Sequence, residues 1–382
     1  MDYQLSDDQL MIRDLARTIA EEKVLPVRAE LDEKEEFPTD IMKAIADADL
    51  FRVFVPTDYD GLGGGVLDEC LIIEEISRAC GGVALCYAAS LLGTIPILLF
   101  GTDEQKKKYL PRAADGALAA FALTEESAGS DASNMTTTAV LDGDEYILNG
   151  AKQWITNGGV ADVYTVIAMT DKNKGSRGAS AFIVEKGTPG FSFGKKEKKM
   201  GIRASATTEL IFNDCRIKKT NMLAKEGMGF IIALRTLDLS RPGVAAQAVG
   251  IAQGAFEEAL KFAKERKQGG QPVVQYQAVQ HILADMAIAI EAARALTYAV
   301  ARAIDAGEKS YAKESSMAKC LASDTAMRVT TDAVQVMGGH GYMREYPVEK
   351  MMRDARITQI YEGTNQIQRN IIAANLIKET LR

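Results

Sequence analysis

The spacing of apolar residues divides this chain into three stretches with different periods. In the first, which ends near residue 118, apolar side chains recur at the spacing of an amphipathic helix: Leu10, Ile12, Leu15, Ile19 and Val24. Residues that commonly begin helices stand before its apolar runs: Ser6, Pro38-Thr39, and Thr102 followed by Gln105. This first stretch is therefore predicted to be helical.

The second stretch runs from about Ala119 to Leu223, and its apolar residues alternate with a period of two. An Asp-Gly pair between two runs of strand-forming residues predicts a β-hairpin over Ala139–Leu148. Further alternating segments follow at Val163–Met169, Ala179–Val184 and Thr207–Phe212. We expect a compact antiparallel β domain in the middle of the chain.

From Gly227 onward the helical period returns, over Gly250–Lys267, Ala284–Ala303 and Met317–Val336. The chain has no internal repeat and no long linker. The pattern predicts an α+β fold of three domains, with boundaries at residues 1–118 (helical), 119–225 (β) and 226–382 (helical).

A segment without charged residues lies between Arg78 and Asp103, and it is long enough to cross a bilayer. It is interrupted by Ser90, Gly93 and Pro96, and it lacks the long Leu/Ile/Val blocks of a membrane span. We interpret it as a pair of buried helices.

Composition excludes several function classes. The 382 residues carry a net charge of −7, which gives no basic footprint for nucleic acid. The acidic N-terminus lacks the basic and apolar regions of a secretory signal. Five cysteines without CxxC spacing fit reduced thiols in a cytoplasm, and two histidines far from any cysteine pair make a metal site improbable.

The strongest candidate for chemistry is Glu362, which directly follows the apolar-aromatic pair Ile360-Tyr361. Such neighbours desolvate a carboxylate and raise its pKa, so that it can remove a proton from a weakly acidic carbon. Gly363 permits a backbone with positive φ or a close approach to a ligand. From composition alone, a solvated Glu-Gly turn between two helices remains the alternative.

Other polar segments have a functional and a purely structural interpretation. The hydroxyl and glycine-rich segment Phe121–Ser130 can bond a planar heterocycle or a phosphate, or it is only a loop after a strand. The only tryptophan, Trp154, is either a core residue or a stacking surface. Asp238 and Arg241 are three residues apart on a predicted helix and can simply pair. Gly61–Gly65 lacks the spacing of a dinucleotide-binding loop.

Tyr361-Glu362-Gly363-Thr364, followed by Asn365-Gln366-Ile367-Gln368, resembles the C-terminal signature of the acyl-CoA dehydrogenases. Further blocks resemble that family in the family's order, over nearly the whole length of the chain. The resemblance implies a helical–β–helical fold with a C-terminal four-helix bundle. It also implies an FAD cofactor, a homotetramer built as a dimer of dimers, and an electron-transferring flavoprotein as partner.

The resemblance also assigns roles to residues. Glu362 is the expected catalytic base. The expected substrate contacts are Ser130, Asp238, Arg241, Tyr361 and Gly363. The expected FAD contacts are Phe121, Leu123, Thr124, Gly129, Ser130, Trp154, Ile155, Thr156, Arg266, Gln268, Gln277, Gln335, Gly338, Gly339, Thr364 and Gln366. In the family, the block around Gln335 reaches the FAD of a neighbouring subunit.

Three positions bear on how far the resemblance carries. Relatives that place the base elsewhere have a glutamate at the position of Ser240, so Glu362 is the matching base here. Pro242 replaces a usual aliphatic residue, and its ring predicts a kink in the helix. Gly269 stands where the family has phenylalanine, so the adenosine side of the cofactor is expected to be held more loosely or packed by another residue.

The function that the resemblance implies is α,β-dehydrogenation of a short- or medium-chain acyl-CoA, whether straight, branched or alicyclic. Three alternatives remain. An enoyl-CoA reductase would use the same residues in the opposite direction, and an acyl-CoA oxidase would pass electrons to O₂. A flavin-free acyl-CoA-binding protein would be colourless.

Overall fold

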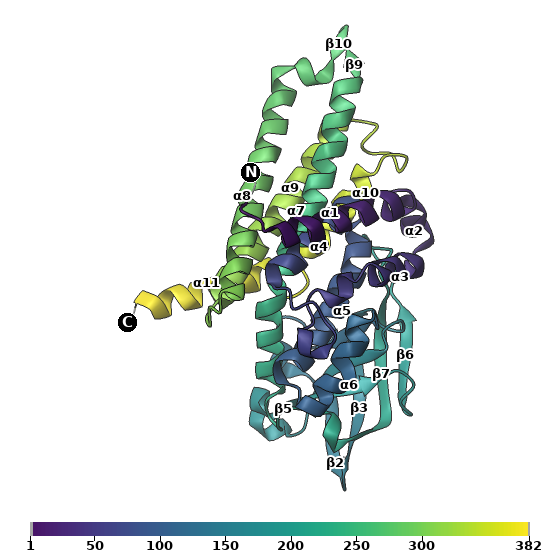
Figure 1. Ribbon diagram of the computed structural model, residues 1–382, viewed down its shortest axis with the longest axis vertical. Helices are drawn as coiled ribbons and strands as arrows, with labels where there is room; N and C mark the ends of the chain where they lie inside the picture. The colour runs from purple at the N-terminus through teal and green to yellow at the C-terminus, as the bar shows by residue number, and fades with distance from the viewer. Residues whose placement is uncertain (1–2, 381–382) are drawn as a thin grey trace.

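The computed structural model describes residues 3–380, which form two helical parts joined through a β sheet. In Figure 1 the long C-terminal helices α7, α8 and α9 extend from the sheet along the longest axis of the molecule. The N-terminal helices lie between the sheet and these long helices. This arrangement brings the first and last parts of the sequence together near the middle of the molecule.

The N-terminal part of the described chain contains six α-helices, the capping box predicted at Thr102 is present, and the predicted cap Ser6 also forms one. Ser6 and Gln9 cap the first helix, and Thr102 and Gln105 cap the sixth, because each side chain bonds the other residue's backbone N–H. The residues Gly61–Gly65 form a loop before the fourth helix. The helices are α1 (Asp7–Ile19), α2 (Arg28–Lys34), α3 (Thr39–Asp47), α4 (Val66–Ala79), α5 (Gly81–Phe100) and α6 (Asp103–Ala114).

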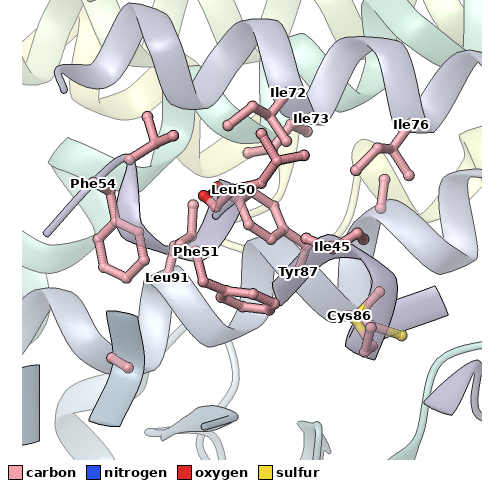
Figure 2. Close-up of a cluster of buried hydrophobic side chains, with 14 of the residues drawn as sticks. Ile45, Leu50, Phe51, Phe54, Ile72, Ile73, Ile76, Cys86, Tyr87 and Leu91 are labelled. Carbon is pink, nitrogen blue, oxygen red and sulfur yellow. Dashed lines mark hydrogen bonds between the residues drawn. The ribbon is translucent and has the colours of Figure 1, made fainter. Parts of the chain in front are cut away.

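The charge-free segment is one helix, α5, so the prediction of a helix pair was wrong. Pro96 lies inside this helix and is buried, and the helix continues through it. α5 is long and apolar enough to cross a membrane, but 72% of its most apolar window is buried within the protein. Figure 2 shows Tyr87 and Leu91 of α5 packed beside Ile72 and Ile73 of α4.

The sheet has eight strands in the order β6-β7-β3-β2-β4-β5-β8, with β1 paired to β4. The predicted hairpin is confirmed, because Asp142 and Glu145 close the turn between β2 and β3. The sheet is not purely antiparallel as predicted. The strands are β1 (Ala119–Ala122), β2 (Thr138–Asp142), β3 (Glu145–Thr156), β4 (Val163–Met169), β5 (Ala179–Glu185), β6 (Phe191–Lys196), β7 (Thr207–Lys218) and β8 (Met222–Leu223).

The exception concerns β4, which runs parallel to β1 and also makes one parallel pair with β2. The hairpin β2–β3 lies between β1 and β4 in sequence and connects these two parallel strands. β1 also approaches α5 closely, because a Cβ on Gly93 of α5 would lie 2.5 Å from the backbone nitrogen of Ala120. This close approach places the end of β1 beside the N-terminal helices.

The C-terminal part confirms the three predicted helical segments, which fall in α7, α8 and α9, except that α7 ends at Glu265 and the predicted end at Lys267 lies in a short strand. Small side chains of α7, such as Ala252 and Ala255, are fully buried against the other helices. α7 continues through Pro242, and the kink predicted there stays a prediction. The helices are α7 (Gly229–Glu265), α8 (Gln277–Asp305), α9 (Ala312–Met337), α10 (Val348–Thr358) and α11 (Asn365–Thr380).

Candidate active site

A cavity of about 400 Å³ lies where the helical parts meet the sheet. Its walls come from α4, α5 and α7, from β1 and the loop after it, from the end of β3, and from residues 361–371. The lining is mostly apolar, as is usual for a pocket that binds an organic ligand. Most of the residues predicted around the reaction centre line this cavity: Phe121, Leu123, Thr124, Gly129, Ser130, Trp154, Ile155, Thr156, Arg241, Tyr361, Glu362 and Gly363.

Glu362 lies in the short connection between α10 and α11, and its backbone is left-handed, with φ of 50°. Such a conformation is uncommon for a residue with a side chain. Gly363 follows with φ of 92°, and a Cβ there would lie 2.8 Å from the Nε2 of Gln368. The glycine is therefore required both by the backbone and by the space beside it.

Two buried side chains hold this connection. Gln368 Nε2 donates to the carbonyl oxygens of Glu362, at 3.0 Å, and of Gly363, at 2.9 Å. Lys319 of α9 is fully buried and donates to the Gly363 carbonyl and to Asn365 Oδ1, both at 2.9 Å. Sequence reasoning missed Lys319, because no local pattern links it to a residue in another helix.

The environment of the Glu362 carboxyl confirms the expected direction of its pKa shift. Burial raises the pKa, and three groups oppose part of this effect: the Ser240 hydroxyl, Arg241 and Lys319. Ser240 Oγ donates to Glu362 Oε2 at 2.5 Å. Burial also lowers the pKa of Lys319 to about 8.

The Ser240 hydrogen bond should affect how the reaction rate depends on pH. It favours the ionised form of Glu362, so removing it in Ser240→Ala should raise the Glu362 pKa further. We expect the acid limb of the pH profile of substrate-dependent flavin reduction to move to higher pH. Ser240→Thr keeps a hydroxyl and serves as the control, with a limb close to that of the wild type. An unchanged or acid-shifted limb in Ser240→Ala would contradict the assignment.

Arg241 and Asp238 form the ion pair that their spacing predicted, at 2.7 Å. Arg241 is buried and faces the cavity, whereas Asp238 does not line the cavity and instead holds the guanidinium. Tyr361 donates to Gln247 Oε1, and Gln247 Nε2 donates to the carbonyl of Gly81 at 2.9 Å. Gln247, which was not predicted, thereby ties the Glu362 segment to the start of α5.

The opposite wall is fixed by a buried ion pair that sequence reasoning also missed. Lys152 of β3 contacts Glu125 at 2.7 Å and donates to the Leu123 carbonyl at 2.9 Å. Burial alone would raise the Glu125 pKa, but Lys152 and the hydrogen bonds from Thr136 outweigh it and lower the pKa to about 2. The pair therefore locks the loop after β1 against β3, where Thr124 and Trp154 face the cavity.

Trp154 is not a core residue, because 55% of its surface is exposed. It has φ of 58° and lies at an irregularity in the pairing of β3 with β7. A flat aromatic face on a cavity wall, beside the hydroxyls of Thr124, Ser130 and Thr156, fits a planar heterocycle that needs both stacking and hydrogen bonds. The residues present therefore fit the isoalloxazine ring of FAD.

The structure does not bring all predicted FAD contacts to this cavity. Six of them are exposed and do not line it: Arg266, Gln268, Gln277, Gln335, Gly338 and Gly339. The first three lie at or beside the small hairpin β9 (Lys267–Gln268) and β10 (Gln271–Pro272), at the end of the long helices far from the sheet (Figure 1). The block around Gln335 lies near the same end, since His340 packs on Phe262 of α7 with ring centroids 5.2 Å apart.

Two further predicted contacts, Thr364 and Gln366, also lie outside the cavity lining. The Thr364 hydroxyl accepts from the backbone N–H of Ile367 at 3.3 Å, so it supports the start of α11. At Gly269, a Cβ would lie 2.4 Å from the Tyr276 hydroxyl oxygen. Tyr276 therefore occupies the space beside Gly269, and a phenylalanine there would require Tyr276 to move and a left-handed backbone, with φ of 58°.

Family models match nearly the whole chain. The N-terminal, middle and C-terminal domains of acyl-CoA dehydrogenase match residues 6–117, 120–215 and 227–377. A protein described as short-chain specific acyl-CoA dehydrogenase, from Clostridium acetobutylicum, is 48% identical over 99% of this chain and 100% of its own length. An acryloyl-CoA reductase (NADH) from Anaerotignum propionicum is 47% identical over 99% and 96%. A cyclohex-1-ene-1-carbonyl-CoA dehydrogenase from Geobacter metallireducens is 48% identical over 98% and 99%.

Solved structures of similar proteins share the fold of this chain. Butyryl-CoA dehydrogenase from Megasphaera elsdenii is 46% identical, with a TM-score of 0.97 over 99% of this chain and 100% of its own. A chain in a structure of the electron transferring flavoprotein of Acidaminococcus fermentans is 51% identical, with a TM-score of 0.96 over 98% and 99%. An acyl-CoA dehydrogenase from Bacillus anthracis complexed with FAD is 38% identical, with a TM-score of 0.94 over 100% and 70%.

The matched domains, the shared fold and a cavity whose residues fit a flavin ring point to one conclusion. This chain belongs to the acyl-CoA dehydrogenase family and is an FAD-dependent oxidoreductase of acyl-CoA.

Proposed function

We propose that the enzyme oxidises a short acyl-CoA between its α- and β-carbons, with Glu362 as the only catalytic base. The carboxyl of Glu362 lies in the wall of the cavity, and burial raises its pKa. A base with such a pKa is suited to take a proton from the carbon next to the thioester carbonyl. This buried carboxyl facing the cavity is the observation that carries the proposal.

The negative charge that develops on the thioester oxygen requires a hydrogen-bond donor. Within residues 3–380 the backbone N–H of Glu362 has no hydrogen-bond acceptor, so it is available to a ligand. Gln368 and Lys319 hold the carbonyls on the other side of this peptide segment and keep its direction fixed. The same short segment therefore supplies both the base and a donor.

Position 240 does not carry a second candidate for the base, because its residue is a serine. The Ser240 hydroxyl reaches the Glu362 carboxyl directly, so a side chain at either position can face the same part of the cavity. Of these two positions only 362 carries a carboxyl, which supports its role and agrees with the short- and medium-chain branch of the family.

The residues that we assign to FAD are those that line the sheet side of the cavity, above all Thr124, Ser130, Trp154 and Thr156. When bound, FAD supplies the acceptor for the hydride that leaves the β-carbon. Trp154 would cover one side of the ring and exclude water from it, and the hydroxyls would bond its polar edge.

The test is a visible spectrum of the purified protein, followed by anaerobic addition of a panel of acyl-CoAs. We expect a yellow protein whose flavin absorbance bleaches with butyryl-CoA. Reduction of an enoyl-CoA in the presence of a reduced flavoprotein, without bleaching by butyryl-CoA, would support the reverse direction. The similarity to an acryloyl-CoA reductase is the reason to test this direction. Steady peroxide formation in air would identify an oxidase, and a colourless protein would contradict all three.

Several finer assignments belong to the same proposal. The match to a chain in an electron transferring flavoprotein structure supports such a flavoprotein as the electron acceptor. We infer a homotetramer in the cytoplasm, organised in domains with boundaries at residues 118 and 225. The exposed positions of Arg266, Gln268 and Gln335 support this assembly, since they need a second chain to reach a cofactor. Sedimentation analysis of the purified holoenzyme tests it, and a monomer at micromolar concentration would contradict it.

A further inference from the structure

The cavity contains a second carboxyl that the proposed reaction does not use. Glu69 lies in the first turn of α4 and lines the cavity beside Ile73, which is one turn further along the same helix. The neighbouring lining from α5 and α7 is apolar, including Leu85, Leu92 and Leu234. A carboxyl in such a wall requires an explanation, because burying it without a partner is unfavourable.

Glu69 has no hydrogen-bond donor or cation of the protein beside it within residues 3–380. Its pKa is raised to about 8 by burial and by the negative charges of Asp305 and Asp68. Both of those carboxylates are occupied by backbone N–H groups, Asp305 by Val66 and Leu67 and Asp68 by Gly65. Asp68 Oδ1 also lacks a partner, but among these three carboxyls of the described residues only Glu69 has both oxygens unbonded, and only Glu69 lines the cavity.

Glu69 and Glu362 line the same cavity from different elements, α4 and the connection between α10 and α11. Ile73 faces Gly243 of α7, where an added Cβ would lie 3.1 Å from Ile73 Cδ1. Glu69 is four residues earlier, about 6 Å further along α4. The charged groups that act on Glu362 are Arg241 and Lys319, whereas those that act on Glu69 are Asp305 and Asp68. A thioester placed at Glu362 would therefore direct its acyl chain along a wall that includes Glu69.

We propose that Glu69 is a specificity-determining residue that accepts a hydrogen bond from a donor on the acyl chain, beyond its β-carbon. The favoured substrate is then a short acyl-CoA that carries a hydroxyl or an amine near its far end. A purely aliphatic chain would desolvate the carboxyl without giving it a hydrogen bond, which is unfavourable. This inference rests on the proposed dehydrogenation, because the thioester position is set by Glu362.

The experiment compares three freshly prepared substrates with acyl chains of equal heavy-atom number: pentanoyl-CoA, 4-hydroxybutyryl-CoA and 4-aminobutyryl-CoA. The holoenzyme should show a kcat/KM for at least one donor-bearing substrate that exceeds the value for pentanoyl-CoA by roughly tenfold, the size of one hydrogen bond to an otherwise unpaired buried group. In Glu69→Leu the order should reverse, with pentanoyl-CoA favoured.

Glu69→Gln separates the two donors, since an amide still accepts a hydrogen bond but carries no charge. A preference for the hydroxyl should persist in this variant, whereas a preference for the amine should be lost. Glu104→Leu is the matched control, because Glu104 lies in the first turn of α6 and is exposed to solvent. Its ratios should equal those of the wild type.

The outcomes are distinguishable from those of the proposed function. If butyryl-CoA is oxidised but the ratio of donor-bearing to aliphatic substrate is the same in the wild type and Glu69→Leu, the inference about Glu69 is overturned while the function stands. If no acyl-CoA reduces the flavin of the wild type, the proposed function fails and the inference fails with it.

Discussion

Glu362→Gln is expected to lower the rate of substrate-dependent flavin reduction by on the order of 10²–10⁴, the usual contribution of a positioned general base. Glutamine has nearly the same shape and can still accept the hydrogen bond from Ser240. The loop should therefore keep its conformation while losing the group that takes the proton. Stopped-flow mixing with butyryl-CoA under anaerobic conditions measures the rate.

Two controls make this result specific to the base. The flavin content and thermal stability of Glu362→Gln should match those of the wild type, because the substitution leaves Trp154 and the ion pair of Lys152 unchanged. Glu345→Gln, which removes an exposed carboxyl between α9 and α10, should react at the wild-type rate. A wild-type rate in Glu362→Gln would refute the role of this residue.

Lys152→Met is expected to have the largest effect on stability. It leaves the Glu125 carboxylate buried without its cation, and breaking a buried pair on one side costs about 3–5 kcal/mol of the free energy of unfolding. Because the pair holds the loop that carries Thr124, the variant should also be purified with less bound flavin. Denaturant unfolding and the ratio of flavin to protein absorbance measure the two effects.

The double variant Glu125→Gln/Lys152→Met removes the unpaired charge and should recover part of the lost stability. The pKa of Glu125 also sets how its contribution to stability changes with pH. The folded pKa of Glu125 is about 2 and its unfolded pKa about 4.3, so the wild type has this contribution above pH ~4.3 and loses it as the pH falls towards 2. Equal stability of Lys152→Met and the wild type at pH 7 would contradict the assignment.

Much of the fold could be predicted because its signals are local. Ser6 with Gln9 and Thr102 with Gln105 are capping boxes that any window of four residues reveals. The Asp-Gly hairpin between β2 and β3 is equally local. The errors concern tertiary structure. That α5 is one helix through Pro96 depends on its burial, and that β4 runs parallel to β1 depends on the path of the whole middle part.

The site divides in the same way. Glu362 and Gly363 were found because an acid, an aromatic neighbour and a glycine stand together in the sequence. Lys319, Gln247 and Glu69 were missed because each comes from another helix and carries no signal of its own. The exposed residues Arg266 and Gln335 were predicted from the resemblance, and a single chain leaves them outside the cavity.

The cavity draws its walls from nearly the first and the last parts of the chain, and this order has a consequence for biosynthesis. Glu69 and the residues of α5 leave the ribosome early, whereas Glu362 follows Glu69 by 293 residues. A nascent polypeptide can therefore assemble the flavin-facing strands before its reactive carboxyl exists. A product that stops before residue 362 lacks this carboxyl and should be inert towards acyl thioesters.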